Sequence, residues 1–237
     1  MKNPKKERGR SNLVSLTTSS RARAGEVRLV GGIWRRTPLA VADLGGLRPT
    51  PERVRETVFD WLSHLFGTFE GRAALDLFAG SGALGLEAVS RGMAELDAVE
   101  RDKLQARNIL QTVSKLSAGD VVRVHGEDAF GFLSRTTESY DVIFIDPPFA
   151  LNLQDEAIRK ALPRLKAEGI LYVERTGART TEALLNELGL VRLRSTSAGQ
   201  VDCELLARKA SLMAGLAREE KPPKRNMRRE RNKEQRE

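Results

Sequence analysis

The sequence predicts an α/β fold built on a seven-stranded, mostly parallel sheet with one antiparallel strand, and three observations support it. From residue 71 onward, short apolar runs alternate with helical patterns, which is typical of parallel strands joined by helices. A glycine-rich turn at 79–85 follows the first apolar run, where open α/β sheets bind their ligands. The last two apolar runs are separated by a short Ser/Gly loop that has no room for a crossover helix, so we expect them to pair antiparallel. The architecture predicted is therefore Rossmann-like.

Each element follows from its own local pattern. The strands are expected at 73–78, 96–100, 121–125, 142–145, 170–173, 190–194 and 201–207. Helices are expected after the glycine turn through about residue 90, and at 102–117, 153–165 and 180–188. Before the sheet, two apolar runs at 27–30 and 33–36 flank Gly31 and Gly32, which predicts a β-hairpin. Thr50 as N-cap and Pro51 as first helical residue predict the start of a further helix.

Length and composition indicate one domain with extensions. The chain has 237 residues, of which 40% are apolar, and it contains one cysteine. A single cysteine excludes an intramolecular disulfide and suits a reducing, cytoplasmic compartment. No apolar run approaches the length of a membrane span, so we expect no membrane association.

Charge is distributed unevenly along the chain. Residues 1–28 carry a net charge of +6 and residues 218–237 a net charge of +4, which leaves −2 of the total +8 for the rest. Basic ends of this kind either keep a protein soluble or bind a polyanion.

The same charge pattern sets the expected domain boundaries. We expect a disordered basic leader at 1–24, for which an organellar transit peptide is the alternative because residues 11–24 are rich in Ser and Arg. One catalytic domain is expected at 25–210, with hairpin and helix at 25–66 and the sheet at 71–208. A disordered basic tail is expected at 211–237.

The glycine turn indicates a nucleotide-like cofactor. Gly80, Gly82 and Gly85 satisfy the dinucleotide spacing, and Glu100 ends the next strand about 20 positions later, where a carboxylate can accept from ribose hydroxyls. The spacing alone does not separate NAD from S-adenosylmethionine. Asp76 at the end of the first strand favours the latter, because a carboxylate opposes a pyrophosphate but suits a cationic amino acid group. Phe78 lies in the same turn and is predicted to contact the cofactor.

A second motif decides the class of reaction. Asp146, Pro147, Pro148 and Phe149 follow the apolar strand at 142–145. An exocyclic amine is a poor nucleophile because its lone pair is delocalised into the ring. The Asp146 side chain and the Pro147 carbonyl could accept both N–H groups and direct the lone pair at a methyl donor. Prolines make the turn rigid, and Phe149 could stack on the base.

The remaining candidate residues carry weaker signals. Asp128, with Ala129 after it, could accept from an adenine amino group, or Asp128 could equally cap a helix. Cys203 lies within a predicted strand and reads as a core residue, which argues against methylation through a cysteine nucleophile. The two histidines, His64 and His125, are far apart in the sequence and suggest no metal site.

The segments resemble the RsmD family of 16S ribosomal RNA guanine-N2 methyltransferases. The matching stretches are VRLVGGIWRR at 27–36, LRPTPERVRETVFDWL at 47–62, LDLFAGSGALGLEAVSRG at 75–92, FIDPPF at 144–149 and GQV at 199–201. The first two are specific to the family, whereas glycine loops and DPPF turns occur in many amino-methyltransferases. One departure is Arg36-Thr37, where the family commonly has Gly-Arg.

This resemblance implies a function and a site. S-adenosylmethionine would be the cofactor, with Glu100 holding its ribose and Asp128 its adenine, and residues 146–149 would hold the guanine. The partner would be 16S rRNA in a small ribosomal subunit or assembly intermediate, bound by a monomer. The arginines expected to contact RNA phosphates are Arg35, Arg36, Arg48, Arg53 and Arg55, although solvated surface positions explain them equally well.

Three alternatives remain open at the level of sequence. Adenine N6 is a rival target, because DPPF turns also serve adenine amines. A nicotinamide-dependent oxidoreductase would explain the glycine loop but not the DPPF turn. A noncatalytic RNA-binding assembly factor would explain the basic ends but not Asp76, Glu100 and DPPF together.

Overall fold

The computed structural model describes residues 27–40 and 50–217, and their centre is one mixed sheet. Its strands are β3 (Ala73–Asp76), β4 (Glu95–Val99), β5 (Val122–His125), β6 (Tyr140–Ile145), β7 (Leu165–Thr176), β8 (Leu190–Ala198) and β9 (Val201–Arg208). They lie in the order β5-β4-β3-β6-β7-β9-β8. Strand β9 is antiparallel to both of its neighbours, and the other pairs are parallel. The predicted sheet, with seven strands and one antiparallel member, is confirmed.

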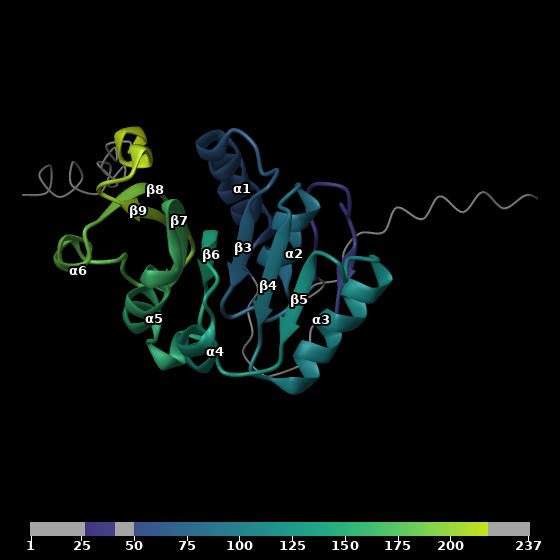
Figure 1. Ribbon diagram of the computed structural model, residues 1–237. Helices are drawn as coiled ribbons and strands as arrows, with labels where there is room; N and C mark the ends of the chain where they lie inside the picture. The colour runs from purple at the N-terminus through teal and green to yellow at the C-terminus, as the bar shows by residue number, and fades with distance from the viewer. Residues whose placement is uncertain (1–26, 41–49, 218–237) are drawn as a thin grey trace, which may run out of the picture.

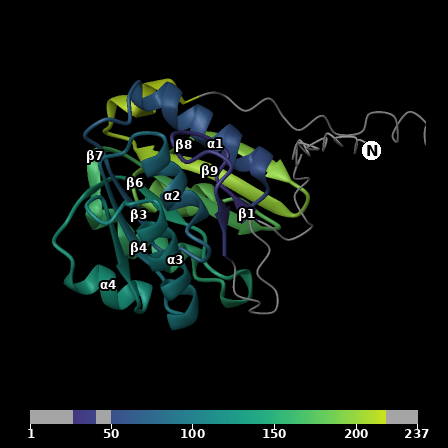
Figure 2. The ribbon, with the colours of Figure 1, turned by 90° about the vertical axis from the view of Figure 1, so that its right-hand side faces the viewer.

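Helices cover both faces of this sheet (Figures 1 and 2). They are α1 (Glu52–Phe66), α2 (Ala83–Ser90), α3 (Lys103–Lys115), α4 (Ala129–Arg135), α5 (Gln154–Ala161) and α6 (Glu182–Glu187). One buried apolar cluster joins α1, α2 and α3 to one face, and a second joins α4, α5 and α6 to the other. The central strands β3 and β6 are buried on both faces and mostly apolar, whereas the edge strand β5 alternates between apolar and polar residues.

The N-terminal hairpin is present, but its second strand differs from the predicted one. Strand β1 (Val27–Arg28) pairs antiparallel with β2 (Pro38–Leu39), not with residues 33–36. The intervening residues bond to the end of α2 instead, because the N–H of Ile33 donates to the Ser90 carbonyl at 2.8 Å and that of Trp34 to the Ser90 hydroxyl at 2.9 Å. Gly32 permits this approach, since its φ is 73° and a Cβ there would lie 1.8 Å from the Ser90 oxygen.

Helix α1 begins one residue later than predicted, and Thr50 does not cap it. Pro51 occupies the N-cap position, where it has no side chain that could cap the helix. The Thr50 hydroxyl instead donates a hydrogen bond of 2.7 Å to Glu174 on β7. The N-terminal segment is thereby tied to the sheet at the end of β7.

Two further differences concern short elements. Helix α4, between β5 and β6, was not predicted, and it consists of seven residues capped by Asp128. The predicted helix at 153–165 is shorter, since α5 is followed by a 3-10 turn, η2 (Leu162–Arg164), and β7 then begins at Leu165. The expected tail at 211–237 begins with a 3-10 helix, η3 (Leu212–Leu216), whereas residues 218–237 and the expected leader at 1–24 lie outside the described residues.

Candidate active site

The glycine turn connects β3 to α2 and is held in shape by a buried carboxylate, that of Asp76. The Asp76 side chain is 2% exposed, and one of its oxygens accepts from the Gly85 N–H at 2.9 Å. Gly80 and Gly82 have φ values of 53° and 76°, a region that favours glycine. A Cβ at Gly85 would lie 2.9 Å from the Leu96 side chain, so glycine lets α2 pack closely on the sheet. The turn predicted to bind a cofactor therefore has the backbone form that this role needs.

Burial changes the acidity of Asp76. Loss of solvation raises its pKa to about 7; the Gly85 hydrogen bond opposes this rise, and the nearby Glu100 carboxylate adds to it. An ionised Asp76 is therefore costly unless a cation lies beside it.

Glu100 directly follows β4 and connects two loops at the same edge. One carboxylate oxygen accepts from the Gly80 N–H at 2.8 Å and the other from the Asp102 N–H at 2.7 Å. Burial is the largest cause of a raised Glu100 pKa. Glu100 thus faces the glycine turn, as its predicted contact with a ribose requires.

Asp128 caps helix α4. One of its oxygens accepts from the N–H groups of Phe130 and Gly131, both at 3.0 Å. Ala129 is the buried first residue of that helix. Helix capping, one of the two interpretations of Asp128, is thus observed, and contact of Asp128 and Ala129 with adenine stays a prediction.

An aromatic pair lies between the glycine turn and α4. Phe78, half-buried in the turn, packs edge-to-face on Phe130 with ring centroids 6.4 Å apart. The sequence indicated Phe78 but not Phe130, because helix α4 itself was not predicted.

The turn at Asp146, Pro147 and Pro148 follows β6 at the same edge. Strands β3 and β6 are neighbours, with Asp76 paired in register with Phe144, so the turn begins two residues beyond the level of Asp76. Asp146 is partly buried, Pro147 is buried and Pro148 is exposed, and Phe149 begins the 3-10 helix η1 (Phe149–Leu151). The structure therefore brings the two main sequence motifs together.

Asp146 is surrounded by other acids. Burial, followed by the Glu174 and Asp76 carboxylates, raises the pKa of Asp146 well above its ordinary value, and a hydrogen bond from Thr50 opposes the rise. Ionisation of Asp146 is therefore costly in the same way as that of Asp76.

Sequence reasoning missed Glu174, which lies on β7 beside Asp146. Its side chain is 1% exposed, and one oxygen accepts from the Thr50 and Tyr172 hydroxyls, both at 2.7 Å. A carboxylate that directly follows an apolar run was the signal that selected Asp76, Glu100 and Asp146, and the run 170–173 with Glu174 after it carries the same signal.

A buried arginine holds the Thr50 segment in place. Arg55 on α1 donates to the Thr50 carbonyl and to the Arg28 carbonyl, both at 2.6 Å. This side chain connects the hairpin, α1 and the active-site edge. The prediction that Arg55 contacts RNA or lies on a solvated surface is therefore wrong, because its side chain is 1% exposed.

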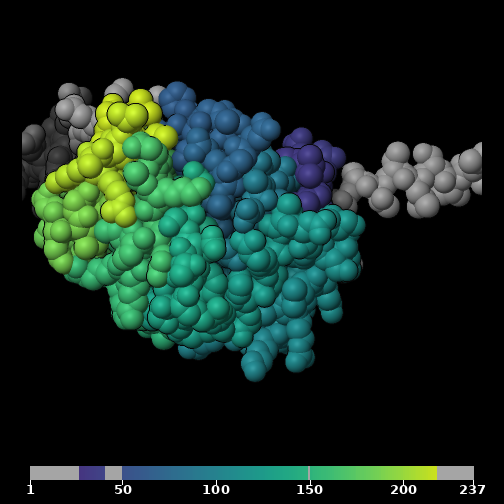
Figure 3. Space-filling view, in the orientation of Figure 1, coloured from purple at the N-terminus to yellow at the C-terminus, as the bar shows by residue number. Residues whose placement is uncertain are grey.

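The arginines predicted to bind RNA are only partly described. Arg35, Arg36 and Arg53 are exposed on the hairpin and α1, and Arg48 lies outside the described residues. Figure 3 shows the hairpin, in purple, beside the blue surface formed by α1 and the residues that follow it. The exposed arginines are consistent both with RNA contact and with a solvated surface.

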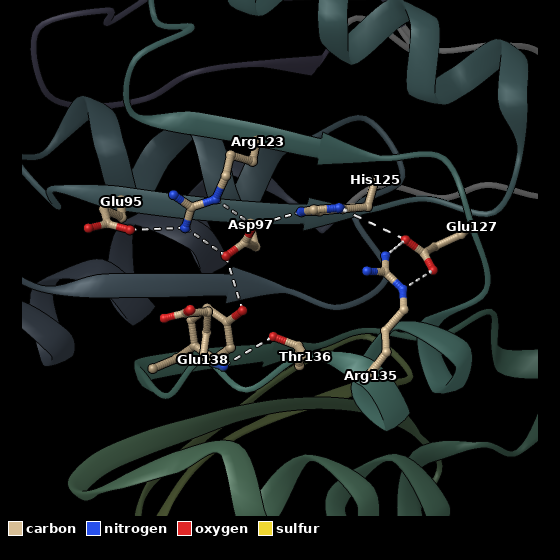
Figure 4. A network of polar contacts seen from close by, with 9 residues as sticks. Glu95, Asp97, Arg123, His125, Glu127, Arg135, Thr136 and Glu138 are labelled. Carbon is tan, nitrogen blue, oxygen red and sulfur yellow. Dashed lines mark hydrogen bonds and ion pairs between the residues drawn. The ribbon is translucent and has the colours of Figure 1, made fainter.

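A separate polar network runs along β4 and β5, from Glu95 at the start of β4 to His125 at the end of β5 (Figure 4). Buried Asp97 on β4 accepts from Arg123 at 2.9 Å and from the Tyr140 hydroxyl at 3.0 Å, and it lies 2.7 Å from His125 Nε2. The network borders a hollow of ≈ 360 Å³. His125 is thus engaged in this network and packs on Phe132 with ring centroids 4.7 Å apart.

The other candidate side chains have structural surroundings. Cys203 is fully buried, as predicted, and burial raises the pKa of its thiol, which keeps it protonated. Within residues 27–40 and 50–217, no three His, Cys, Asp or Glu side chains are grouped to hold a metal ion. No helix in this part of the chain is long and apolar enough to cross a membrane.

The fold and the paired motifs at one sheet edge define the chain as an α/β methyltransferase. Residues 27–207 match the family model described as Conserved hypothetical protein 95. The chain belongs to this family. The match includes all five stretches that resemble the RsmD family, from 27–36 to 199–201.

Relatives and solved structures agree with this assignment. Ribosomal RNA small subunit methyltransferase D of Escherichia coli K12 is 40% identical over 153 residues, which are 64% of this chain and 75% of the relative. The Haemophilus influenzae protein of the same name is 38% identical over 63% of this chain and 79% of its own. The solved Escherichia coli protein yhhF, described as a candidate methyltransferase, is 35% identical with a TM-score of 0.67, over 79% of this chain and all of its own.

Proposed function

We propose that this protein transfers a methyl group from S-adenosylmethionine to the exocyclic N2 of a guanine in small-subunit ribosomal RNA. The observation that carries the proposal is the convergence of Asp76 and the DPPF turn at one sheet edge, in a chain of this family. A nicotinamide oxidoreductase, the alternative from another class, has no use for the DPPF turn.

The charge of the site favours a cationic cofactor over an anionic one. Asp76, Glu100 and Asp146 all have raised pKa values, with burial as the first cause, so the ionisation of each is unfavourable. A cation beside them stabilises their ionised forms, whereas a pyrophosphate would oppose them. S-adenosylmethionine carries two cationic groups, an ammonium and a sulfonium.

Each residue has a definite task in this proposal. Asp76 binds the ammonium of the cofactor, and Glu100 accepts from the ribose hydroxyls. Gly80 and Gly82 let the backbone approach the ligand, and Asp128 is assigned to the adenine end. The bound cofactor supplies a methyl group on a positively charged sulfur.

The turn after β6 orients the nucleophile. Asp146 and the Pro147 carbonyl accept the two amine N–H groups, which directs the nitrogen lone pair out of the ring and toward the methyl group. Most of the rate enhancement then comes from alignment of the reacting atoms. Phe149 supplies a ring for stacking on the base.

The substrate is a large anionic particle, and the exposed arginines fit it. Arg35, Arg36 and Arg53 would contact phosphates, which position a protein without selecting a base. We place the reaction in the cytoplasm, on 16S rRNA within a small subunit or assembly intermediate, with a monomer as the acting unit.

Nucleoside analysis tests the proposal directly. The protein is incubated with isotopically labelled S-adenosylmethionine and small ribosomal subunits that lack this methylation, and the RNA is digested for mass spectrometry. Labelled N2-methylguanosine is expected. Labelled N6-methyladenosine would replace the guanine assignment by the adenine one, and unlabelled RNA despite cofactor binding would overturn the activity.

A further inference from the structure

Glu174 lies next to Asp146 at the carboxyl edge, on the same side of the sheet. Phe144 on β6 is paired in register with Tyr172 on β7, and their rings pack with centroids 5.9 Å apart, so these two side chains point to one face. Side chains alternate between the faces along a strand. Asp146 and Glu174 each follow two residues later, so they continue this face at the edge to which the DPPF turn belongs.

The two carboxylate oxygens of Glu174 have different surroundings. The Thr50 and Tyr172 hydroxyls both donate to Oε2 at 2.7 Å, and the Cys203 sulfur lies 3.9 Å from the same oxygen. Within residues 27–40 and 50–217, no group donates to Oε1, and this oxygen is not fully enclosed. Oε1 is therefore an acceptor that a ligand at this edge can use, on a side chain that is otherwise buried.

The neighbours of Glu174 determine what this open oxygen offers. Burial raises the pKa of Glu174, while the hydrogen bonds from Thr50, Tyr172 and Cys203 and the charge of Arg55 oppose the rise. All four partners stabilise the carboxylate. Because an ionised carboxylate only accepts hydrogen bonds, Oε1 then favours a ligand with an N–H group at that position.

Guanine and adenine differ at the ring nitrogen beside the amine that would be methylated. Guanine has an N1–H donor next to its 2-amino group, whereas adenine has an unprotonated N1, an acceptor, next to its 6-amino group. An enzyme reads such a difference through hydrogen bonds to this edge of the base. An acceptor placed beside the amine pairs with guanine N1–H and opposes adenine N1, which leaves a buried polar group unpaired.

We propose that Glu174 selects guanine, with Oε1 accepting the N1–H while Asp146 and the Pro147 carbonyl accept the amine. This inference rests on the proposed function and assigns the choice of base to a residue outside the predicted motifs. Thr50 and Tyr172 hold the other oxygen and thereby set the direction of the carboxylate.

Replacement of the target guanosine by 2-aminopurine tests the proposal. This analogue keeps the 2-amino group but has an unprotonated N1 and no 6-oxygen. Single-turnover rates are measured with saturating S-adenosylmethionine on small subunits assembled from rRNA that carries either base, and the methylated nucleoside is identified by mass spectrometry. Wild type should prefer guanine by at least about 10-fold, the lower end expected for a hydrogen bond to a charged group.

Glu174→Gln should reverse the chemistry at this position. The amide oxygen can accept the Thr50 and Tyr172 hydroxyls, which leaves the NH₂ group where Oε1 was. That group donates to N1 of 2-aminopurine and opposes the N1–H of guanine. The preference for guanine should therefore fall by at least about 10-fold, to parity or below. The missing 6-oxygen affects wild type and variant alike, so it cancels in this comparison.

Two controls separate base selection from a structural role. Glu168→Gln makes the same chemical change on β7, where Glu168 accepts from the Ser211 hydroxyl at 2.7 Å, and it should keep the wild-type preference. Thr50→Val removes a donor from Oε2 but leaves Oε1 in place, so it should slow both bases by a similar factor. If Glu174 only anchors Thr50, Glu174→Gln will behave like Thr50→Val.

The outcomes distinguish this inference from the proposed function. Wild type that methylates neither base would overturn the proposed function. Equal rates on both bases in wild type, or a wild-type preference in a folded Glu174→Gln, would overturn the role of Glu174 and leave the methyl transfer standing. If Glu174→Gln does not fold, Glu174→Asp keeps the charge but withdraws the oxygen, so it should slow guanine without speeding 2-aminopurine. An unchanged preference in folded Glu174→Asp would likewise overturn the role.

Discussion

Asp76→Asn should gain stability relative to the wild type as pH rises from 5 to 8, although it damages the cofactor site. Asp76 is buried and its pKa is raised from 3.8 to about 7. The folded protein must ionise this group in an environment that disfavours the charge. Asparagine has nearly the same shape, keeps an oxygen for the Gly85 N–H and carries no charge.

The sign and size of the effect follow from proton linkage. Between pH 3.8 and about 7 the folded state binds more protons at Asp76 than the unfolded state, so the wild type loses stability as pH rises. The cost is absent well below pH 4 and complete above pH 7. Between pH 5 and pH 8 the cost of ionising Asp76 grows mainly over the two pH units below its folded pKa, which amounts to about 2–3 kcal/mol.

Urea unfolding followed by tryptophan fluorescence measures this change. The stability of Asp76→Asn minus that of wild type should increase by about 2–3 kcal/mol from pH 5 to pH 8. The unpaired N–H groups of the substituted amide add a penalty of about 1–3 kcal/mol, but that penalty does not depend on pH. Asp120→Asn removes an exposed carboxylate and serves as control. A difference that stays constant or shrinks with rising pH would refute the account of Asp76.

The other predictions concern activity and binding. Asp146→Ala should bind S-adenosylhomocysteine but lose transfer by about 2–4 kcal/mol in activation free energy, and a rate within a few-fold of wild type would exclude its role. Glu100→Ala should weaken cofactor affinity more than the saturated rate, because ribose contacts are equal in ground and transition states; unchanged affinity by calorimetry would contradict this. Deletion of 1–24 and 218–237 should flatten the plot of log RNA affinity against log salt by roughly 0.7–0.9 for each phosphate that is no longer neutralised, while the modified nucleotide stays the same. An unchanged salt slope would show that these basic ends do not bind RNA.

The sheet and the acidic edge could be predicted because they depend on local patterns. The strands β3, β4 and β6 contain apolar runs long enough to be recognised, and a carboxylate at the end of each run marks the edge where ligands bind. Asp76, Glu100 and Asp146 were identified in this way, and the structure places all three at the carboxyl ends of neighbouring strands. That these three carboxylates lie close together follows from the order of the strands in the sheet, not from their spacing along the chain.

The features that escaped prediction depend on contacts between distant segments. The residues after Gly32 have the composition of a strand, yet the Ser90 carbonyl takes the Ile33 N–H, and pairing passes to β2. Thr50 has the composition of a helix cap, yet its hydroxyl bonds to Glu174, 124 positions away. In both cases a local preference competes with a tertiary hydrogen bond that no short-range pattern encodes.

The acidic edge also explains why a buried, unfavourable charge is retained. Glu174 and Asp76 raise the cost of ionising Asp146, and Glu100 raises that of Asp76. A cation that binds among them removes the repulsion as well as adding its own attraction, so the instability of the free site becomes affinity for the ligand. When the ligand loses its sulfonium charge on methyl transfer, the repulsion returns unless a proton replaces that charge. The same carboxylates that favour binding of a cationic cofactor are therefore suited to accept the proton of the amine, which leaves the methylated amine neutral.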